Sequence, residues 1–178
     1  MALEGIGKLG VDDGRVQLVV FLVGRELYGV DIVKTREILR LLPIRSLPNT
    51  PPFLEGVATV RGELIPIIDL RKRFASGSAG PERDARIVVL RSEEAVDIGV
   101  IVDAVCEIAV VETADLKAAP PLLTMLDAAY LLGIAERKDG GAVAIIDTDK
   151  LLSSTERSVV NRARLLADAD ADTADGLP

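Results

Sequence analysis

The amino-acid sequence predicts a mainly β protein that consists of two small, related barrels and a helix near its C-terminus. Short apolar runs alternate with Gly-, Pro- and Asp-rich turns along most of the 178 residues, a pattern typical of strands. One stretch of sequence recurs in the second half of the chain, which indicates a duplicated unit. Near the C-terminus, apolar residues recur three and four positions apart, as in an amphipathic helix.

The first predicted element is a β-hairpin. It follows residues 1–15, which carry few bulky apolar side chains and are expected to form a flexible N-terminus. "VQLVVFLV" (Val16–Val23) and "LYGVDI" (Leu27–Ile32) are the two strands. The segment Val33–Leu39 is then either a helical turn or an irregular strand. "LLPIRSLPNTPPF" (Leu41–Phe53) contains four prolines and is expected to be an extended loop.

A second hairpin is predicted from "GVATVRGELIPIIDL" (Gly56–Leu70). A type II′ turn centred on Gly62 and Glu63 would pair Arg61 with Leu64. Pro66 cannot donate a ladder hydrogen bond, so a bulge or an edge position is expected there. Arg61 stands at the mouth of the hairpin and needs an acceptor, for which Glu37 and Glu63 are the nearest candidates. The alternative for Arg61 is a surface salt bridge worth about 0–1 kcal/mol.

The rest of the chain continues as strands and ends in the helix. Strands are expected near Ile87–Arg91, Ile98–Val102, Val105–Val111, Tyr130–Ala135 and Ala142–Asp147. "RKRF" (Arg71–Phe74) is expected to be a solvated turn between strands. The helix is predicted over residues 154–167, and the Asp- and Ala-rich residues 168–178 are predicted to be an acidic disordered tail.

The internal repeat relates the two halves of the chain. "YGVDIVKTREI" (Tyr28–Ile38) and "IGVIVDAVCEI" (Ile98–Ile108) have the same spacing from glycine to glutamate. Each copy is followed by a hairpin whose second strand contains Ile-Ile-Asp, in "RGELIPIIDLRK" and "DGGAVAIIDTDK". Duplication explains this pattern, although chance similarity between Val- and Ile-rich strands is the alternative.

Composition excludes several classes of partner. With 28 acidic and 21 basic residues the net charge is -7, which argues against nucleic acid as a partner. The longest apolar run, "LVVFLV", is far shorter than the roughly 18 residues of a membrane span, and no signal peptide is evident. A cytoplasmic protein without direct membrane insertion is expected. The single cysteine, Cys106, fits a reducing compartment and is expected to be a small buried apolar residue.

The absence of histidine removes many catalytic arrangements. Without it there is no Ser-His-Asp or Cys-His site and no histidine metal ligand. Asp69, Asp103 and Asp147 each end or follow an apolar run, and such scattered carboxylates are expected to cap turns. The sequence therefore predicts a protein that is not an enzyme and that uses no metal or cofactor.

Four segments together resemble the CheW family of bacterial chemotaxis coupling proteins. They are "LYGVDIVKTREI", "LPNTPPFLEGVATVRGELIPIIDLRKRF", "IGVIVDAVCEI" and "LLGIAERKDGGAVAIIDTDKLL", and the similarity runs from about Val16 to Leu152. The resemblance implies two intertwined five-stranded SH3-like barrels around a hydrophobic seam. It places a CheW-like domain at residues 16–153, with barrels near 30–90 and 91–150 and the N-terminal strands exchanged between them.

The resemblance also implies a role and a set of binding residues. The resemblance implies a non-catalytic adaptor between the cytoplasmic tip of chemoreceptors and the regulatory domain of the histidine kinase CheA, in membrane-associated arrays. Assembly into rings with CheA is an option that the resemblance leaves open. By position, Arg61 and Glu37 would pair at the receptor groove. Five further residues would contact the receptor or shape the groove: Thr35, where the family commonly has valine, Gly56, Ile87, Gly99 and Ile108.

Two alternatives to this role stay open at the level of sequence. A similar scaffold could serve a chemosensory pathway that controls pili or development rather than chemotaxis. The second alternative, which the sequence favours less, is a module that binds a small molecule in the seam between the barrels.

Overall fold

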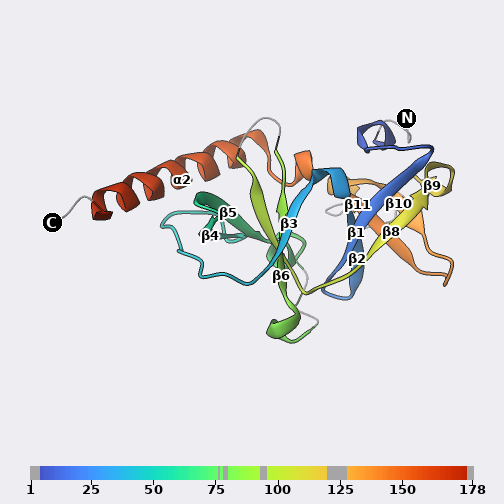
Figure 1. Cartoon of the computed structure of the whole chain (residues 1–178), viewed down its shortest axis with the longest axis horizontal. Coiled ribbons are helices and arrows are strands. Elements are labelled where there is room, and N and C mark those ends of the chain that lie inside the picture. The colour runs from blue at the N-terminus through green and yellow to red at the C-terminus, as the bar shows by residue number, and fades with distance from the viewer. Residues whose placement is uncertain (1–4, 76, 78–79, 93–95, 120–127, 176–178) are drawn as a thin grey trace.

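Two β-sheets lie side by side in the computed structural model, and a long helix, α2 (Ser154–Asp175), extends over one of them (Figure 1). The structure describes residues 5–75, 77, 80–92, 96–119 and 128–175. The predicted mainly β fold with two related sheets is confirmed. Within these ranges no helix has the length and apolar character needed to cross a membrane.

One sheet has five strands and the other has six. The five-stranded sheet consists, in spatial order, of β3 (Thr35–Arg40), β6 (Arg86–Leu90), β7 (Ile98–Val102), β5 (Glu63–Asp69) and β4 (Leu54–Val60). The six-stranded sheet consists of β8 (Ala104–Glu112), β1 (Arg15–Val23), β2 (Glu26–Asp31), β11 (Ala142–Ile146), β10 (Leu131–Glu136) and β9 (Leu116–Lys117). Five strands were expected in each of the two units, and this is wrong for the second sheet, which has six. The additional strand, β9, has only two residues, and so short a segment has no apolar pattern from which it could be predicted.

Short helical segments connect the strands. They are η1 (Ile6–Lys8), η2 (Ile32–Lys34), α1 (Leu70–Arg73), η3 (Glu82–Asp84), η4 (Thr113–Asp115), η5 (Ala128–Tyr130) and η6 (Thr148–Lys150). The ambiguous segment after the first hairpin contains both predicted alternatives, since the helical turn η2 leads directly into strand β3.

The two copies of the repeat exchange strands. Ile67 of the first copy pairs in parallel with Gly99 of the second, and Ile145 of the second pairs in parallel with Gly29 of the first. Each sheet therefore contains strands from both halves of the chain. The boundary expected near residue 90 lies instead after Val102, because β7 pairs with β6 and β5 in the first sheet.

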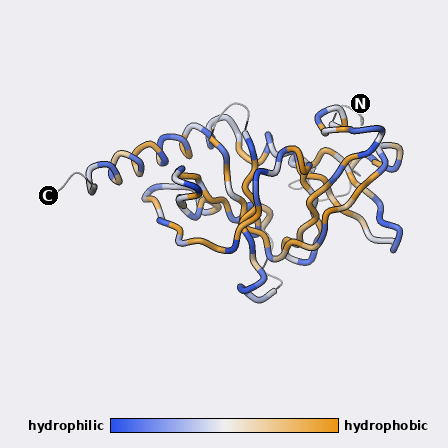
Figure 2. The backbone as a smooth tube through the Cα atoms, in the orientation of Figure 1, coloured by the Kyte–Doolittle hydropathy of each residue, from blue (hydrophilic) through white to orange (hydrophobic). Residues whose placement is uncertain are grey.

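Apolar side chains fill three clusters, one inside each sheet and one between the sheets. Along β1, Leu18 and Val20 face the interior of the six-stranded sheet, whereas Val19 and Phe21 face the other sheet. Strands that are covered on both faces become continuously apolar, which explains the run "LVVFLV". Figure 2 shows how the apolar residues concentrate along the strands. Burial of each such side chain contributes about 1.5–3 kcal/mol.

The N-terminal segment is folded onto the six-stranded sheet, so the expectation of a flexible N-terminus is wrong for residues 5–15. Leu9 is buried in the core of that sheet. Lys8 Nζ lies 3.0 Å from the buried carboxylate of Asp147, and the Gly10 N–H donates to Asp31 at 2.5 Å. Leu9, the partly buried Ile6 and two hydrogen bonds thus hold a segment whose composition resembles a free end.

Helix α2 is longer than the sequence predicted. It continues to Asp175, so the expectation of disorder from residue 168 is wrong as far as that residue, and residues 176–178 lie outside the described residues. Alanine at alternate positions favours helix, and Val160 and Ala167 bury one face. Arg45 in the proline-rich loop holds the acidic half, with Nη1 donating to the Ala167 carbonyl at 3.4 Å and Nη2 lying 3.3 Å from Asp170.

The segment Arg71–Phe74 is not the solvated turn that was expected. Most of it belongs to α1, and Phe74 is buried. The guanidinium of Arg73 stacks over Phe53 at 4.3 Å and over Tyr130 at 5.1 Å from the ring centroids. Its two terminal nitrogens each donate to Glu156 at 2.9 Å, and this contact fixes the first turn of α2. The segment is ordered because its cation has two aromatic partners and an acid.

Candidate protein-binding site

The β4–β5 hairpin turns at Arg61 and Gly62. Val60 pairs with Glu63, and the φ angles of Arg61 and Gly62 are 49° and 81°, which defines a type I′ turn. The predicted type II′ turn, centred one residue later on Gly62 and Glu63, is wrong. The sequence Arg-Gly-Glu is compatible with either turn, provided that Arg61 adopts the left-handed conformation that the type I′ turn requires. For a residue other than glycine this conformation costs about 1–2 kcal/mol.

Pro66 avoids the predicted ladder conflict. It lies opposite Val57, and the irregularity falls on β4 between Leu54 and Gly56. Parallel pairing of β5 with β7 begins one residue later, at Ile67. The bulge therefore lies near the far end of the hairpin and not at the proline itself.

Arg61 and Glu37 form the ion pair that the sequence suggested. Arg61 Nε lies 3.0 Å and 3.1 Å from the two carboxylate oxygens of Glu37. The Arg61 side chain is 71% exposed, whereas that of Glu37 is 14% exposed. The hydrogen bond to Glu37 raises the pKa of the Arg61 guanidinium above its ordinary value, so the cation is permanent. Among the described residues, the terminal nitrogens of Arg61 have no hydrogen-bond acceptor.

A bulge in β3 gives Glu37 this position. The pairing of β3 with β6 shifts between Thr35 and Glu37, and Arg36 is the extra residue. Arg36 Nη1 donates to Glu63 at 2.7 Å and to Asp97 at 3.1 Å. Glu63, the other candidate partner of Arg61, is therefore occupied by Arg36.

Three of the expected site residues are internal to the five-stranded sheet. Gly56, Ile87 and Gly99 are buried. A Cβ on Gly56, whose φ is 143°, would lie 2.0 Å from the Arg45 carbonyl oxygen. A Cβ on Gly99 would lie 2.9 Å from Ile87 Cγ2. These residues shape the sheet that carries Arg61 and Glu37, and they do not themselves offer a surface to a partner.

The other two expected residues lie on the edge strands of the two sheets. Thr35 begins β3, and its hydroxyl donates to the Asp31 carbonyl at 3.3 Å. Ile108 lies on β8 and is 57% exposed. The structure thus joins Arg61 with Glu37 directly but places Ile108 in the other sheet.

Exposed apolar residues border the line along which the two sheets meet, which we call the seam. Ile38 pairs with Val88 and Ile108 pairs with Val19, and both partners belong to the core between the sheets. Paired residues project to the same face, so Ile38 and Ile108 both face the seam. Ile38, which is 39% exposed, occupies the repeat position of Ile108, and this equivalence could have identified it from the sequence.

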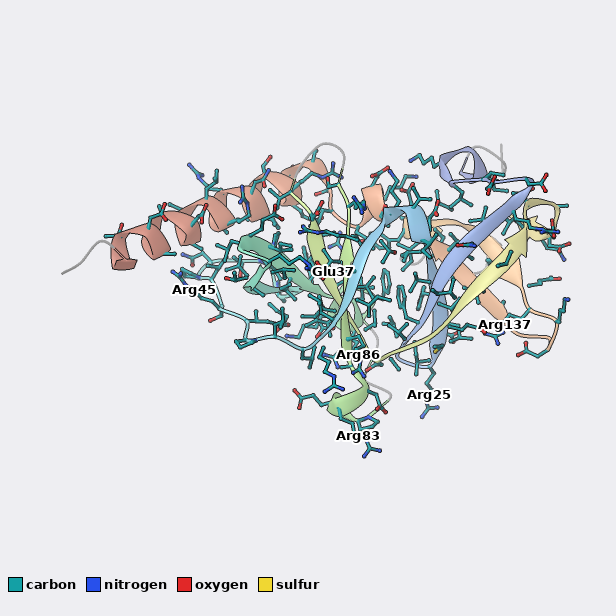
Figure 3. The ribbon with its side chains drawn as sticks, in the orientation of Figure 1. Arg25, Glu37, Arg45, Arg83, Arg86 and Arg137 are labelled. Carbon is teal, nitrogen blue, oxygen red and sulfur yellow. The ribbon has the colours of Figure 1, made fainter. Side chains whose placement is uncertain are left out.

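The second repeat carries its own glutamate–arginine pair. Glu107, the repeat equivalent of Glu37, lies 2.8 Å from Arg137, which follows β10 in the six-stranded sheet (Figure 3). Arg137 was not predicted from the sequence, because the turn of the second hairpin is longer than that of the first and shifts the arginine out of the repeat spacing. Cys106, next to Glu107, is exposed and not buried as expected. Partial burial and the charge of Glu107 raise the pKa of its thiol, so it is not an activated nucleophile.

The aspartates at strand ends cap turns, as predicted. Asp69 accepts from the Arg71 N–H at 2.9 Å, and Asp147 accepts from the Asp149 N–H at 3.1 Å. Asp103 accepts from the Gly24 N–H at 2.7 Å. Across the described ranges no group of three or more acidic or cysteine side chains is placed to hold a metal ion.

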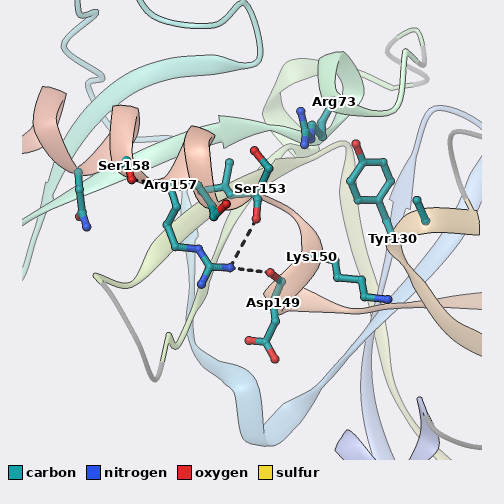
Figure 4. A pocket seen from close by; sticks show the side chains of 11 residues that line it. Arg73, Tyr130, Asp149, Lys150, Ser153, Arg157 and Ser158 are labelled. Atoms are coloured by element: carbon teal, nitrogen blue, oxygen red, sulfur yellow. Dashed lines mark hydrogen bonds between the residues drawn. The ribbon is translucent and has the colours of Figure 1, made fainter.

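A pocket of about 610 Å³ lies between η6, α1 and the start of α2 (Figure 4). Three cations line it, but two of them serve the fold. Arg73 binds Glu156, and Arg157 donates to the Asp149 carbonyl at 2.6 Å. The polar lining therefore serves mainly to attach α2.

These features define a class of protein: a two-sheet β module whose surface carries oriented charges and exposed apolar side chains. A family model described as a CheW-like domain matches residues 17–156. The chain belongs to the CheW family of chemotaxis proteins.

Individual relatives agree with this assignment. The chemotaxis protein CheW of Treponema pallidum is 35% identical over 152 residues, covering 83% of this chain and 88% of the relative. CheW of Klebsiella aerogenes is 31% identical over 159 residues, covering 89% and 95%. Protein FrzA of Myxococcus xanthus is 32% identical over 145 residues, covering 80% and 88%.

A solved structure gives the same result. The crystal structure of the scaffolding protein TtCheW from Thermoanaerobacter tengcongensis superposes with a TM-score of 0.71 at 36% sequence identity. The match covers 79% of this chain and 94% of that chain. The similarity therefore extends over both sheets.

Proposed function

We propose that this protein is a non-catalytic adaptor that couples chemoreceptors to the histidine kinase CheA in the cytoplasm, at membrane-associated receptor arrays. The observation that carries the proposal is Arg61. It is exposed, it is oriented by a nearly buried glutamate, and it holds a backbone conformation that is unfavourable for arginine. Strain of this kind is retained where a function requires it.

The Arg61 guanidinium is suited to recognition of a polar protein surface. Glu37 binds Nε, so the terminal nitrogens remain able to donate to acceptors on a receptor tip. Because Glu37 fixes the side chain in advance, less rotamer entropy is lost on binding.

Apolar contact would come from the seam. Ile38 and Ile108 are exposed on facing edges, and Val110 lies on the same face of β8 as Ile108. A standard interface buries about 1,200–2,000 Å² in total, with apolar residues at its centre and polar residues at its rim. Glu37 pairs with Val89 and so lies on the opposite face of the edge strand β3 from Ile38, which would place Arg61 at the outer rim of this arrangement.

Coupling would arise from simultaneous binding. Contact with receptor and kinase together raises their effective concentration, so each individual contact can be weak. A shift in the receptor can then bias the kinase between two states through the shared adaptor. The kinase regulatory domain would occupy a surface that does not include Arg61, and repeated contacts of this kind would permit rings.

Titration calorimetry with a receptor cytoplasmic fragment and, separately, with the kinase regulatory domain tests the proposal. We expect Arg61→Glu to weaken receptor binding by about tenfold or more, which is about 1.4 kcal/mol, and to leave kinase binding unchanged. Arg137→Glu is the matched control, because it reverses an arginine of the equivalent pair in the other sheet. Equal effects of both variants on the receptor, or no effect of Arg61→Glu, would reject the proposed site.

A further inference from the structure

The outward face of α2 exposes large apolar side chains. Leu165 and Leu166 are 57% and 64% exposed, whereas Val160 and Ala167 on the opposite face are almost fully buried against the body of the protein. Figure 1 shows that neither sheet covers the outward side of this helix. Around the leucines the same stripe carries Ser158, Arg162, Ala169 and Thr173, at spacings of three and four residues. Small residues beside leucine permit the close approach of a second helix.

Charge is separated along α2. The arginines lie in the first half, at Arg157, Arg162 and Arg164, and residues 165–175 contain no cation. Three exposed aspartates follow the leucines, at Asp168, Asp170 and Asp172. The leucines therefore lie between a basic segment and an acidic segment of the same helix.

We infer that α2 docks in antiparallel orientation on α2 of a second copy of this chain. With Leu165 and Leu166 of both copies at the centre, Arg162 of each copy lies beside Asp168 of the other, while Asp170 stays paired with Arg45 of its own chain. A parallel arrangement would place like charges together, so charge complementarity selects the antiparallel one. The two helix dipoles also oppose each other in this arrangement, which is favourable.

The geometry of one copy permits this pair. Because Val160 and Ala167 attach the opposite face, the sheet of each copy lies behind its own helix. The proline-rich loop borders the stripe on one side only, at Arg162 and Leu166. Arg45 and the contact between Arg73 and Glu156 anchor α2 at two points, so the helix is a firm platform for docking. The resulting interface has twofold symmetry and closes on itself, so it gives dimers and not fibres.

The association should be weak. One pair of helices in contact over about four turns buries less than the roughly 1,200 Å² at the lower limit of stable complexes. We therefore expect a dissociation constant in the range of about 10⁻⁵ to 10⁻³ M. Such an interaction acts only where copies are concentrated, and the inference requires neither receptor nor kinase.

Sedimentation equilibrium of the full chain, from about 10 μM to 1 mM, tests the inference. We expect reversible dimerisation that Leu165→Glu weakens at least tenfold. Val11→Glu is the matched control, because Val11 is a similarly exposed apolar residue near the N-terminus, 48% exposed, and should leave dimerisation unchanged. Circular dichroism establishes that each variant is folded.

A charge swap tests the orientation. Arg162→Glu alone and Asp168→Arg alone should each dimerise at least tenfold more weakly, because like charges then face each other. An equimolar mixture should recover dimers, since both sets of contacts become attractive in the heterodimer. A wild-type chain that remains monomeric at 1 mM, an insensitive Leu165→Glu variant, or a mixture without recovery would each overturn the inference.

Discussion

At the scale of single residues, Arg61 is where local stability and surface chemistry conflict. A type I′ turn favours Asn or Gly at its first central position, and this chain has an arginine there. The sequence was sufficient to predict the partner, Glu37, because the family motif and the need for an acceptor agree. It could not determine the turn type, since Gly62 fits either position and the left-handed conformation of Arg61 has no sequence signature.

This conflict gives a prediction for folding stability. Arg61→Gly and Arg61→Ala both remove the guanidinium and its ion pair, but only glycine adopts a φ near 49° without cost. We expect the glycine variant to be more stable than the alanine variant by about 1 kcal/mol in urea unfolding. An alanine variant of equal or greater stability would show that the turn is not strained.

At the scale of elements, the two ends of the chain show what composition misses. The N-terminal segment and the last turns of α2 have few bulky apolar residues, and both were predicted to be free. Leu9 enters a core at one end with Ile6 packed beside it, and Arg45 holds a backbone carbonyl at the other. Contacts of this kind depend on tertiary structure and leave no periodic pattern in the sequence.

The attachment of α2 predicts a pH dependence. Burial tends to raise the pKa of Glu156, but hydrogen bonds from Arg73 and from the Ser153 N–H outweigh it, and the net pKa is below the ordinary value of 4.5. A carboxylate with a depressed folded-state pKa contributes stability above its unfolded pKa and loses it as the pH falls through the folded value.

Glu156→Gln tests that dependence. We expect the variant to be less stable than wild type by about 1 kcal/mol at pH 7. The difference should begin to shrink as the pH falls below the ordinary glutamate pKa of 4.5 and should vanish once the pH has passed the lower folded-state pKa, where the carboxylate of the folded protein becomes protonated. Urea unfolding of both proteins at pH 7 and pH 3 measures this, and a difference that is constant with pH would show that the charge of Glu156 is unimportant.

At the scale of the whole molecule, strand exchange makes the two halves interdependent. The repeat in the sequence revealed two related units, and the family resemblance supplied their interweaving. Neither indicated that β7 belongs to the first sheet, because a strand's sheet partner is not encoded in its own apolar pattern. The pairs Ile67 with Gly99 and Ile145 with Gly29 show that each half completes the sheet of the other.

Because the two halves of the chain depend on each other, neither should fold when the chain is divided into two fragments. If the chain is cut between Ser92 and Asp97, each fragment lacks strands of both sheets. We expect each fragment alone to be unfolded by circular dichroism and an equimolar mixture to recover the β-sheet spectrum. A fragment that folds alone would show that one sheet is an independent unit.

The most direct test of the adaptor role is recruitment of one partner by way of the other. Receptor cytoplasmic fragments attached to vesicles are mixed with the kinase regulatory domain, with or without this protein, and the vesicles are sedimented. We expect the kinase domain to sediment when wild-type protein or Arg137→Glu is present, and to stay in solution with Arg61→Glu or with no adaptor. Recruitment that survives Arg61→Glu, or that never occurs with the wild-type chain, would contradict the account.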